Sequence, residues 1–294
     1  MDMPTAEQFE ALAGAYERYR SEFSDKNNAL PYPAPDSYEL AELADLAIKL
    51  DAIHFDSFSL SMCEASMYAF DWLHSTPAFQ MALNALPAHT LNKSFAKNFE
   101  SALIRGYARS SRRPHMIGWW LPEIAGNYLR YISGIASACH NYQTGKSVRA
   151  ALNGAETIAR MNRLAGELTQ LSVSDWIAAE DQKSLLLHIG RLERKINHIA
   201  STRQPSSQRN DPDLASRLMA GELIRLNDRH FGNPHKRAIF LLMGLPFIDR
   251  PLEMRTIERL IKAKKRPTTV IQADSVTKPG ISSEILTTEV QLTS

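Results

Sequence analysis

Two groups of basic side chains have the type and spacing that suit contact with a phosphate backbone. The first group consists of Arg255, Arg259, Lys262, Lys264, Lys265 and Arg266. Positions 255, 259, 262 and 266 recur every three or four residues, so they fall on one narrow face of a helix. The apolar residues Ile257, Leu260 and Ile261 lie on the opposite side. A helix docked through these three residues would present a row of cations that neutralises phosphates and releases counterions.

The second basic group precedes an aromatic stretch. It consists of Arg105, Arg109, Arg112 and Arg113, followed in the chain by Trp119 and Trp120. Arginines mixed with aromatic rings suit single-stranded nucleic acid, because bases stack on rings while guanidinium groups hold phosphates. The two tryptophans fit better as anchors of a core or an interface. For both basic groups the alternative is an ordinary solvated helix face.

Residues for catalysis or metal binding form no motif. The nine histidines include no HExxH pattern, and no glycine-rich phosphate loop is present. Cys63 and Cys139 are expected to be buried, reduced thiols, and Cys63 lacks the glycines of a nucleophile elbow. We therefore expect no catalytic residue, no metal and no cofactor, and a binding protein rather than an enzyme. An enzyme whose pocket is assembled from distant residues stays open as an alternative.

Charge is distributed unevenly along a chain that is nearly neutral overall. The 294 residues carry 34 basic and 32 acidic side chains, a net charge of +2. Residues 1–100 hold 6 basic and 15 acidic side chains, whereas residues 203–266 hold 14 and 7. A basic region of this kind favours an anionic partner. The acidic third is expected to be solvated surface, with pairing to the basic region of the same chain or of a second subunit as the alternative.

Helical periodicity dominates, and no strand alternation persists. We expect an all-α, multi-helix fold with a long antiparallel αα-hairpin and a small C-terminal helical module. Pro122 is expected in the first turn of its helix, and Asn233-Pro234 is expected to cap and begin another. The predicted helices span residues 5–23, 36–50, 59–74, 77–86, 90–109, 122–142, 146–170, 174–200, 213–229, 233–243 and 251–265.

The predicted hairpin, residues 146–200, consists of two long helices joined by about four residues. Its second helix carries Leu185, Ile189, Leu192, Ile196 and Ile199, spaced four, three, four and three. This spacing is typical of a heptad seam. The seam could pack against the same chain or form the interface of a homo-oligomer.

The predicted domain organisation has four parts. A helical main domain spans 1–201, acidic over 1–100 and basic over 101–201. A linker rich in proline, serine and glutamine spans 202–212. A basic three-helix module spans 213–266, and the tail 267–294 is expected to be disordered. Seven residues separate the last two helices, too many for a strict helix-turn-helix.

These features lead to a ranked expectation for function. The first is a non-enzymatic nucleic-acid-binding or regulatory protein that contacts DNA or RNA phosphates through its basic helix faces. The second is an oligomeric protein-interaction or structural component that uses the hairpin. The N-terminus lacks the features of a secretory signal, and charges interrupt the most apolar stretch. We therefore expect a cytoplasmic protein with no membrane partner.

Overall fold

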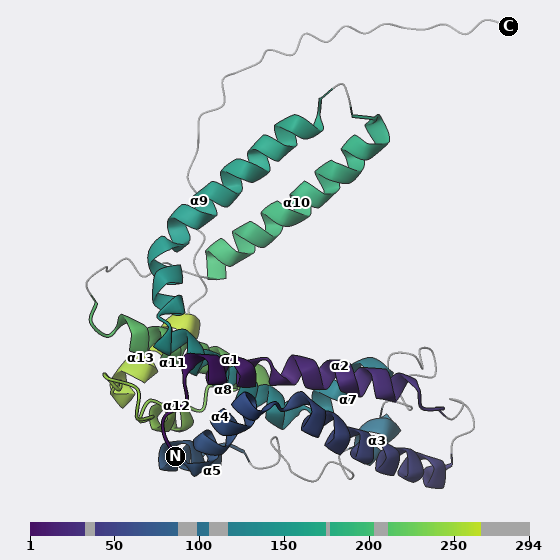
Figure 1. Ribbon diagram of the computed structural model, residues 1–294. Coiled ribbons are helices and arrows are strands. Elements are labelled where there is room, and N and C mark those ends of the chain that lie inside the picture. The colour runs from purple at the N-terminus through teal and green to yellow at the C-terminus, as the bar shows by residue number, and fades with distance from the viewer. Residues whose placement is uncertain (33–38, 88–98, 106–116, 175–176, 203–210, 266–294) are drawn as a thin grey trace, which may run out of the picture.

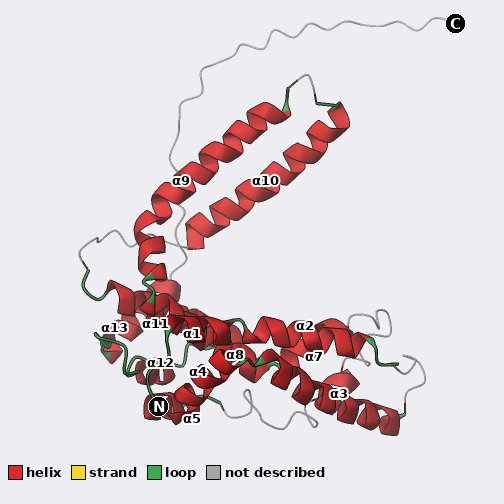
Figure 2. Ribbon diagram, viewed as in Figure 1, coloured by secondary structure: helices red, strands yellow, loops and turns green. Residues whose placement is uncertain are grey.

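The computed structural model describes residues 1–32, 39–87, 99–105, 117–174, 177–202 and 211–265. It describes the backbone but not the side chains of residues 117–120, 155, 198–202, 264 and 265. Within the described residues the fold is all-α and contains no strand (Figure 2). The all-α prediction is therefore confirmed. None of the described helices is long and apolar enough to cross a membrane.

The described helices have the following bounds in chain order. They are α1 (Ala6–Ala13), α2 (Ala15–Asn28), α3 (Leu40–Ser61), α4 (Glu64–Ser75), α5 (Pro77–Asn84), α7 (Ile117–Ala125), α8 (Asn127–Gln143), α9 (Lys146–Ser172), α10 (Ala179–Thr202), α11 (Leu214–Phe231), α12 (Lys236–Leu242) and α13 (Met254–Lys265). Residues 99–105 are also helical.

The first predicted helix is two helices in the structure. Thr5 caps α1 through a reciprocal capping box with Gln8, and the chain breaks at Gly14 before α2 continues to Asn28. Glycine is a poor helix former, so it marks the position where two short helices can part. The predicted break between 50 and 59 is wrong, because α3 runs unbroken to Ser61. It ends where Met62 turns extended.

One hydrophobic core joins the N-terminal and C-terminal helices. Phe9 of α1 packs against Trp72 of α4 and against Phe247, with ring centroids 5.9 and 5.8 Å apart. Trp72 and Phe247 are themselves 6.2 Å apart, which closes the cluster. Helix α1 lies on α8 and α4, α11 lies on α8, and α12 lies on α5. The segment from 211 to 265 is thus packed onto the helices that the first half of the chain provides.

The junction of α7 and α8 is held by close packing around Gly126. A Cβ atom there would lie 2.5 Å from Cε1 of Tyr19 and 2.8 Å from Cε2 of Tyr16, so only glycine fits. Pro122 lies inside α7, not in the first turn of a helix as predicted. Helix α7 already begins at Ile117, before the proline, and the chain breaks at Gly126 one turn after it. The hydrogen bond that a proline removes lies on its N-terminal side, so the break after Pro122 is attributed to Gly126 itself, a poor helix former.

Helices α9 and α10 form an arm that projects from the body (Figure 1). They lie side by side along most of their lengths and are joined by residues 173–178. At the root of the arm, Glu222 of α11 accepts hydrogen bonds from Ser147 of α9 and Asn141 of α8. One carboxylate therefore ties three helices together where the arm leaves the body.

Buried polar contacts fix the C-terminal helices. Tyr131 of α8 donates to Oδ1 of Asn227 on α11 at 2.9 Å, and both residues are fully buried. Gly232 ends α11 in the left-handed conformation, which glycine adopts readily. Most of the predicted linker, residues 203–210, lies outside the described residues, so the domain boundaries stay a prediction.

Candidate nucleic-acid interface

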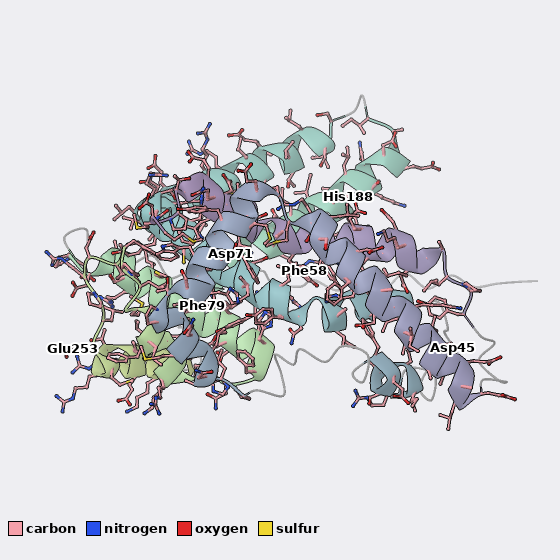
Figure 3. All side chains as sticks on the ribbon, turned by 60° about the horizontal axis from the view of Figure 1, so that its bottom comes forward. Asp45, Phe58, Asp71, Phe79, His188 and Glu253 are labelled. Atoms are coloured by element: carbon pink, nitrogen blue, oxygen red, sulfur yellow. The ribbon has the colours of Figure 1, made fainter. Side chains whose placement is uncertain are left out.

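The basic face of α13 is exposed because the opposite face is anchored in the core. Ile257 is fully buried, and Leu260 and Ile261 are half-buried against the same core. Arg255, Arg259 and Lys262, which lie on the other side of the helix, are all exposed. In Figure 3, side chains tipped with nitrogen project from α13 into solvent near Glu253. Among the described residues, none of the three cations forms an ion pair.

A second helix extends this face with residues that the sequence analysis did not include. Lys236 and Arg237, in the first turn of α12, are both exposed. Helix α12 contacts α13, and the Nζ atom of Lys236 lies 2.6 Å from Oε1 of Glu258 on α13. We call the set Lys236, Arg237, Arg255, Arg259 and Lys262 the α12/α13 basic face.

Glu258 is the acidic side chain of α13 that borders this face. The hydrogen bond and the charge of Lys236 hold the pKa of its carboxyl below the ordinary value, and the charges of Lys262 and Arg255 act in the same direction. The carboxyl therefore responds to a surrounding field that is positive. Lys236 and Glu258 neutralise each other in part, so three uncompensated cations of α13 and Arg237 dominate the surface.

A buried hydrogen-bond chain positions α12. The side-chain amide of Asn227 donates to the carbonyl oxygen of Pro234 at 2.8 Å, while its Oδ1 accepts from Tyr131. His235 follows with a positive φ of 46°, the left-handed conformation that residues other than glycine adopt only under constraint. Its backbone N–H donates to Oδ1 of Asn233. The turn thereby aims Lys236 toward α13.

This turn also corrects a predicted helix start. Asn233 and Pro234 lie before α12, which begins at Lys236, and His235 is its N-cap residue. The physical reason is the left-handed backbone of His235, which a right-handed helix cannot contain, while the carbonyl of Pro234 accepts a hydrogen bond from Asn227 of α11. The capping role expected for Asn233 is replaced by a tight turn within residues 232–235.

The second predicted basic group is described only in part. Arg105 is exposed at the end of the helical segment 99–105. Arg109, Arg112 and Arg113 lie outside the described residues. Phe99 stacks on Phe23 of α2, with ring centroids 6.2 Å apart. That end of α2 lies away from α13 in Figure 1, so Arg105 belongs to a different part of the surface.

Three further predicted residues of the first group are also only partly described. Lys264 and Lys265 are the last residues of α13, and the positions of their side chains are not described. Arg266 lies outside the described residues. Their contribution to the basic face therefore stays a prediction.

The described acidic residues of the first hundred positions form no ion pair with the basic face. Among the described residues of 1–100, the ion pairs are Glu17 with Arg20 and Asp56 with Lys26. Within the described part of the chain, no ion pair joins an acidic residue of 1–100 to α12 or α13. Arg237, Arg255, Arg259 and Lys262 are exposed, whereas Lys236 pairs with Glu258 of the same face.

The exposure of Cys63 differs from the prediction. Cys63 is exposed where it was expected to be buried, because it lies in the two-residue break between α3 and α4. Its Sγ atom lies 3.3 Å from Oγ of Ser66, and this hydrogen bond lowers the thiol pKa. Cys139 is buried as predicted, and burial raises its pKa. Neither cysteine is in a disulfide.

Metal ligands do not converge in the described ranges. No group of three or more histidine, cysteine, aspartate or glutamate side chains there could hold a metal ion. Two histidines whose pKa values burial lowers lie instead within the helix packing. His54 contacts Tyr19, and His230 contacts Asn127.

Comparison with known proteins identifies no match to this chain. The chain matches no protein-family model, no curated protein and no solved structure.

Proposed function

We propose that this protein binds a nucleic acid through the α12/α13 basic face and acts as a binding protein, not as an enzyme. The observation that carries the proposal is the exposed row of Arg255, Arg259 and Lys262 on a helix whose other face is locked into the core. The row spans about 10 Å, since an α-helix rises 1.5 Å per residue. That length matches the axial rise of about three nucleotides in one strand of B-DNA.

The expected interaction is with the phosphate backbone. Arginine forks pair with phosphate oxygens in a bidentate manner, and lysine adds a point charge. With three phosphates neutralised, the logarithm of the binding constant should fall with the logarithm of salt concentration with a slope of about −3. Such contacts hold a duplex or a single strand without reading its bases.

The test is fluorescence anisotropy with labelled 30-nucleotide duplex DNA and single-stranded RNA over a series of salt concentrations. The variant R255E/R259E/K262E is expected to lose at least about 100-fold in affinity and to flatten the salt slope. The matched control is K183E/R191E/R194E, which changes the net charge equally on the exposed outer side of α10. If the α13 variant binds like the wild type, the assignment of the binding site to α13 is wrong. If both variants lose equal affinity, the effect comes from net charge and not from contacts at α13.

A second candidate function is a protein-interaction or structural role for the α9/α10 arm, as an antiparallel hairpin. The observation that favours it is the row of exposed leucines along both helices. The predicted oligomer seam is divided in the structure. Ile189 and Ile196 are buried, Leu185 and Leu192 are 42% and 45% exposed, and the side chain of Ile199 is not described.

A further inference from the structure

The α9/α10 arm leaves a stripe of large apolar side chains uncovered. These are Met161, Leu164, Leu168 and Leu171 on α9 and Leu185 and Leu192 on α10, each between 42% and 60% exposed. Single exposed leucines are ordinary on a protein surface, whereas a contiguous apolar patch of this kind marks an interaction site.

On α9 the uncovered stripe is separate from the seam that faces α10. Ala165 and Ser172 are buried in the seam, at 1% and 3% exposure. The four apolar residues of the stripe are spaced three, four and three, so they fall within an arc of about 80° beside that seam. Helix α9 thus has two faces suited to packing, and α10 covers one of them.

Helix α10 repeats this arrangement. Ile189 and Ile196 are buried in the seam that faces α9. Leu185 and Leu192 occupy the other apolar position of the same heptads, beside the seam, and are about half exposed. The short connection 173–178 makes the two helices antiparallel. When each helix is viewed from its own N-terminus, the stripe is rotated from the seam in the same direction. Because the two helices run in opposite directions, these equal rotations place both stripes on one face of the arm.

We propose that this face docks on the same face of a second copy of the chain, so that two arms form a four-helix bundle. A two-helix pair with one apolar face on each helix is half of such a bundle, with side chains already at coiled-coil spacing. A two-fold axis makes the contact closed and self-complementary. The inference goes beyond the proposed nucleic-acid binding and does not depend on it.

The apolar area agrees with this occupant. Six side chains that are each about half exposed present roughly 500 Å² of apolar surface per copy. Flanking residues along the two long helices bring the contact toward the roughly 800 Å² per partner of a specific interface.

The charges that border the stripes fit a second copy better than a strongly charged partner. The flanking positions are Glu156, Arg160, Arg163 and Glu167 on α9 and Asp181, His188 and Lys195 on α10. Each edge carries both signs, and Figure 3 labels His188 on α10. Flanks of one sign would repel an identical copy.

The test is sedimentation velocity of the full chain without nucleic acid, over a concentration series from 1 to about 100 μM, a range that brackets typical homodimer affinities. The wild type is expected to reach a dimer, and L164E/L168E/L192E is expected to remain a monomer across the series. The matched control is L152E/L187E, at residues that are 39% and 52% exposed but point away from the stripe. The control is expected to dimerise like the wild type.

The result that would overturn the inference is a monomeric wild type at the highest concentration, or a dimer that persists in the stripe variant. Circular dichroism checks that the variants keep the helix content of the wild type. If the triple variant is unfolded, Leu168→Ser and Leu192→Ser take its place, each expected to weaken dimerisation about tenfold. Equal dimerisation of both single variants and the wild type would overturn the inference in the same way.

Discussion

The phenolic oxygen of Tyr19 lies 2.8 Å from Nδ1 of His54, and both side chains are buried between α2 and α3. Burial lowers the pKa of His54 from 6.5 to about 4. The folded protein therefore holds this imidazole neutral. Its Nδ1 atom is placed to accept a hydrogen bond from the Tyr19 hydroxyl group. His230 is in a similar position between α8 and α11, where burial first and then Arg130 and Arg229 lower its pKa to about 4.

These two histidines make the stability depend on pH in a defined window. The unfolded chain binds a proton at His54 near pH 6.5, but the folded chain does so only near pH 4. Between these values the unfolded state holds more protons, so stability is fully present above the window and is lost as pH falls through it. Each histidine should lower the free energy of unfolding by about 2 kcal/mol between pH 7 and pH 5.

Urea unfolding of the wild type and His54→Gln at pH 5, 6 and 7 measures this dependence. The variant is expected to show a clearly smaller decrease than the wild type but not to lose it, because the lowered pKa values of His230 and His235 still contribute. His188→Gln, at an exposed position of α10, is the control and should leave the decrease unchanged. An identical decrease in the wild type and His54→Gln would contradict the assignment.

Substitution by alanine should have opposite effects on stability at Gly126 and at Gly166. Gly126→Ala should destabilise the protein by about 2–4 kcal/mol, because the new methyl group would overlap Tyr16, Tyr19 and the carbonyl of Pro122. Gly166→Ala in α9 should stabilise its helix by about 0.5–1 kcal/mol, since nothing lies within 4 Å of the added atom. Thermal unfolding of the two variants beside the wild type separates them. A stable Gly126→Ala protein would mean that α7 is not packed on α2 as described.

The sequence predicts what one helix determines by itself. The exposure of Arg255, Arg259 and Lys262 follows from their spacing opposite Ile257, because a docked helix must bury its apolar side. The all-α class follows from the same periodicity over the whole chain. The tail and Arg109, Arg112 and Arg113 lie outside the described residues and stay predictions.

What depends on contacts between helices was not predictable in this way. Lys236 joins the basic face through a turn that Asn227 holds from a neighbouring helix, and no spacing within α12 or α13 indicates that contact. The exposure of Cys63 depends on where α3 ends, and helix ends are the least determined part of a periodic pattern. The heptad in α10 gives five equivalent positions, whereas packing on α9 buries Ile189 and Ile196 alone among the four that are described.

Glu258 provides a test of the basic face that adds affinity instead of removing it. Glu258→Gln removes the negative charge beside Arg255 and Lys262 and releases Lys236 from its ion pair. Affinity for DNA is expected to rise about three- to tenfold at low salt, with a steeper salt slope. Glu167→Gln on α9 makes the same change in net charge at a distant site and should have a much smaller effect. Equal gains in the two variants would contradict a local contact at α13.

The two sets of apolar residues on α10 should differ in what they stabilise. Ile196 is 3% exposed and Leu192 is 45% exposed, although both belong to one heptad. Ile196→Ala should therefore loosen the arm itself by about 2–3 kcal/mol, because it opens a cavity between α9 and α10. Leu192→Ala should cost the isolated chain less than about 1 kcal/mol, since its side chain loses little burial.

Amide hydrogen exchange along α9 and α10, measured at 1 μM to keep association low, distinguishes the two effects. Faster exchange through both helices is expected for Ile196→Ala, and exchange near the wild-type rate for Leu192→Ala. At high concentration Leu192→Ala should exchange faster than the wild type, because Leu192 would gain its burial only in the proposed four-helix bundle of two copies. The dimer proposal would be contradicted if amide exchange in α9 and α10 were slow and independent of concentration in all three proteins. The arm would then be stable within a single chain, without burial of its exposed stripe.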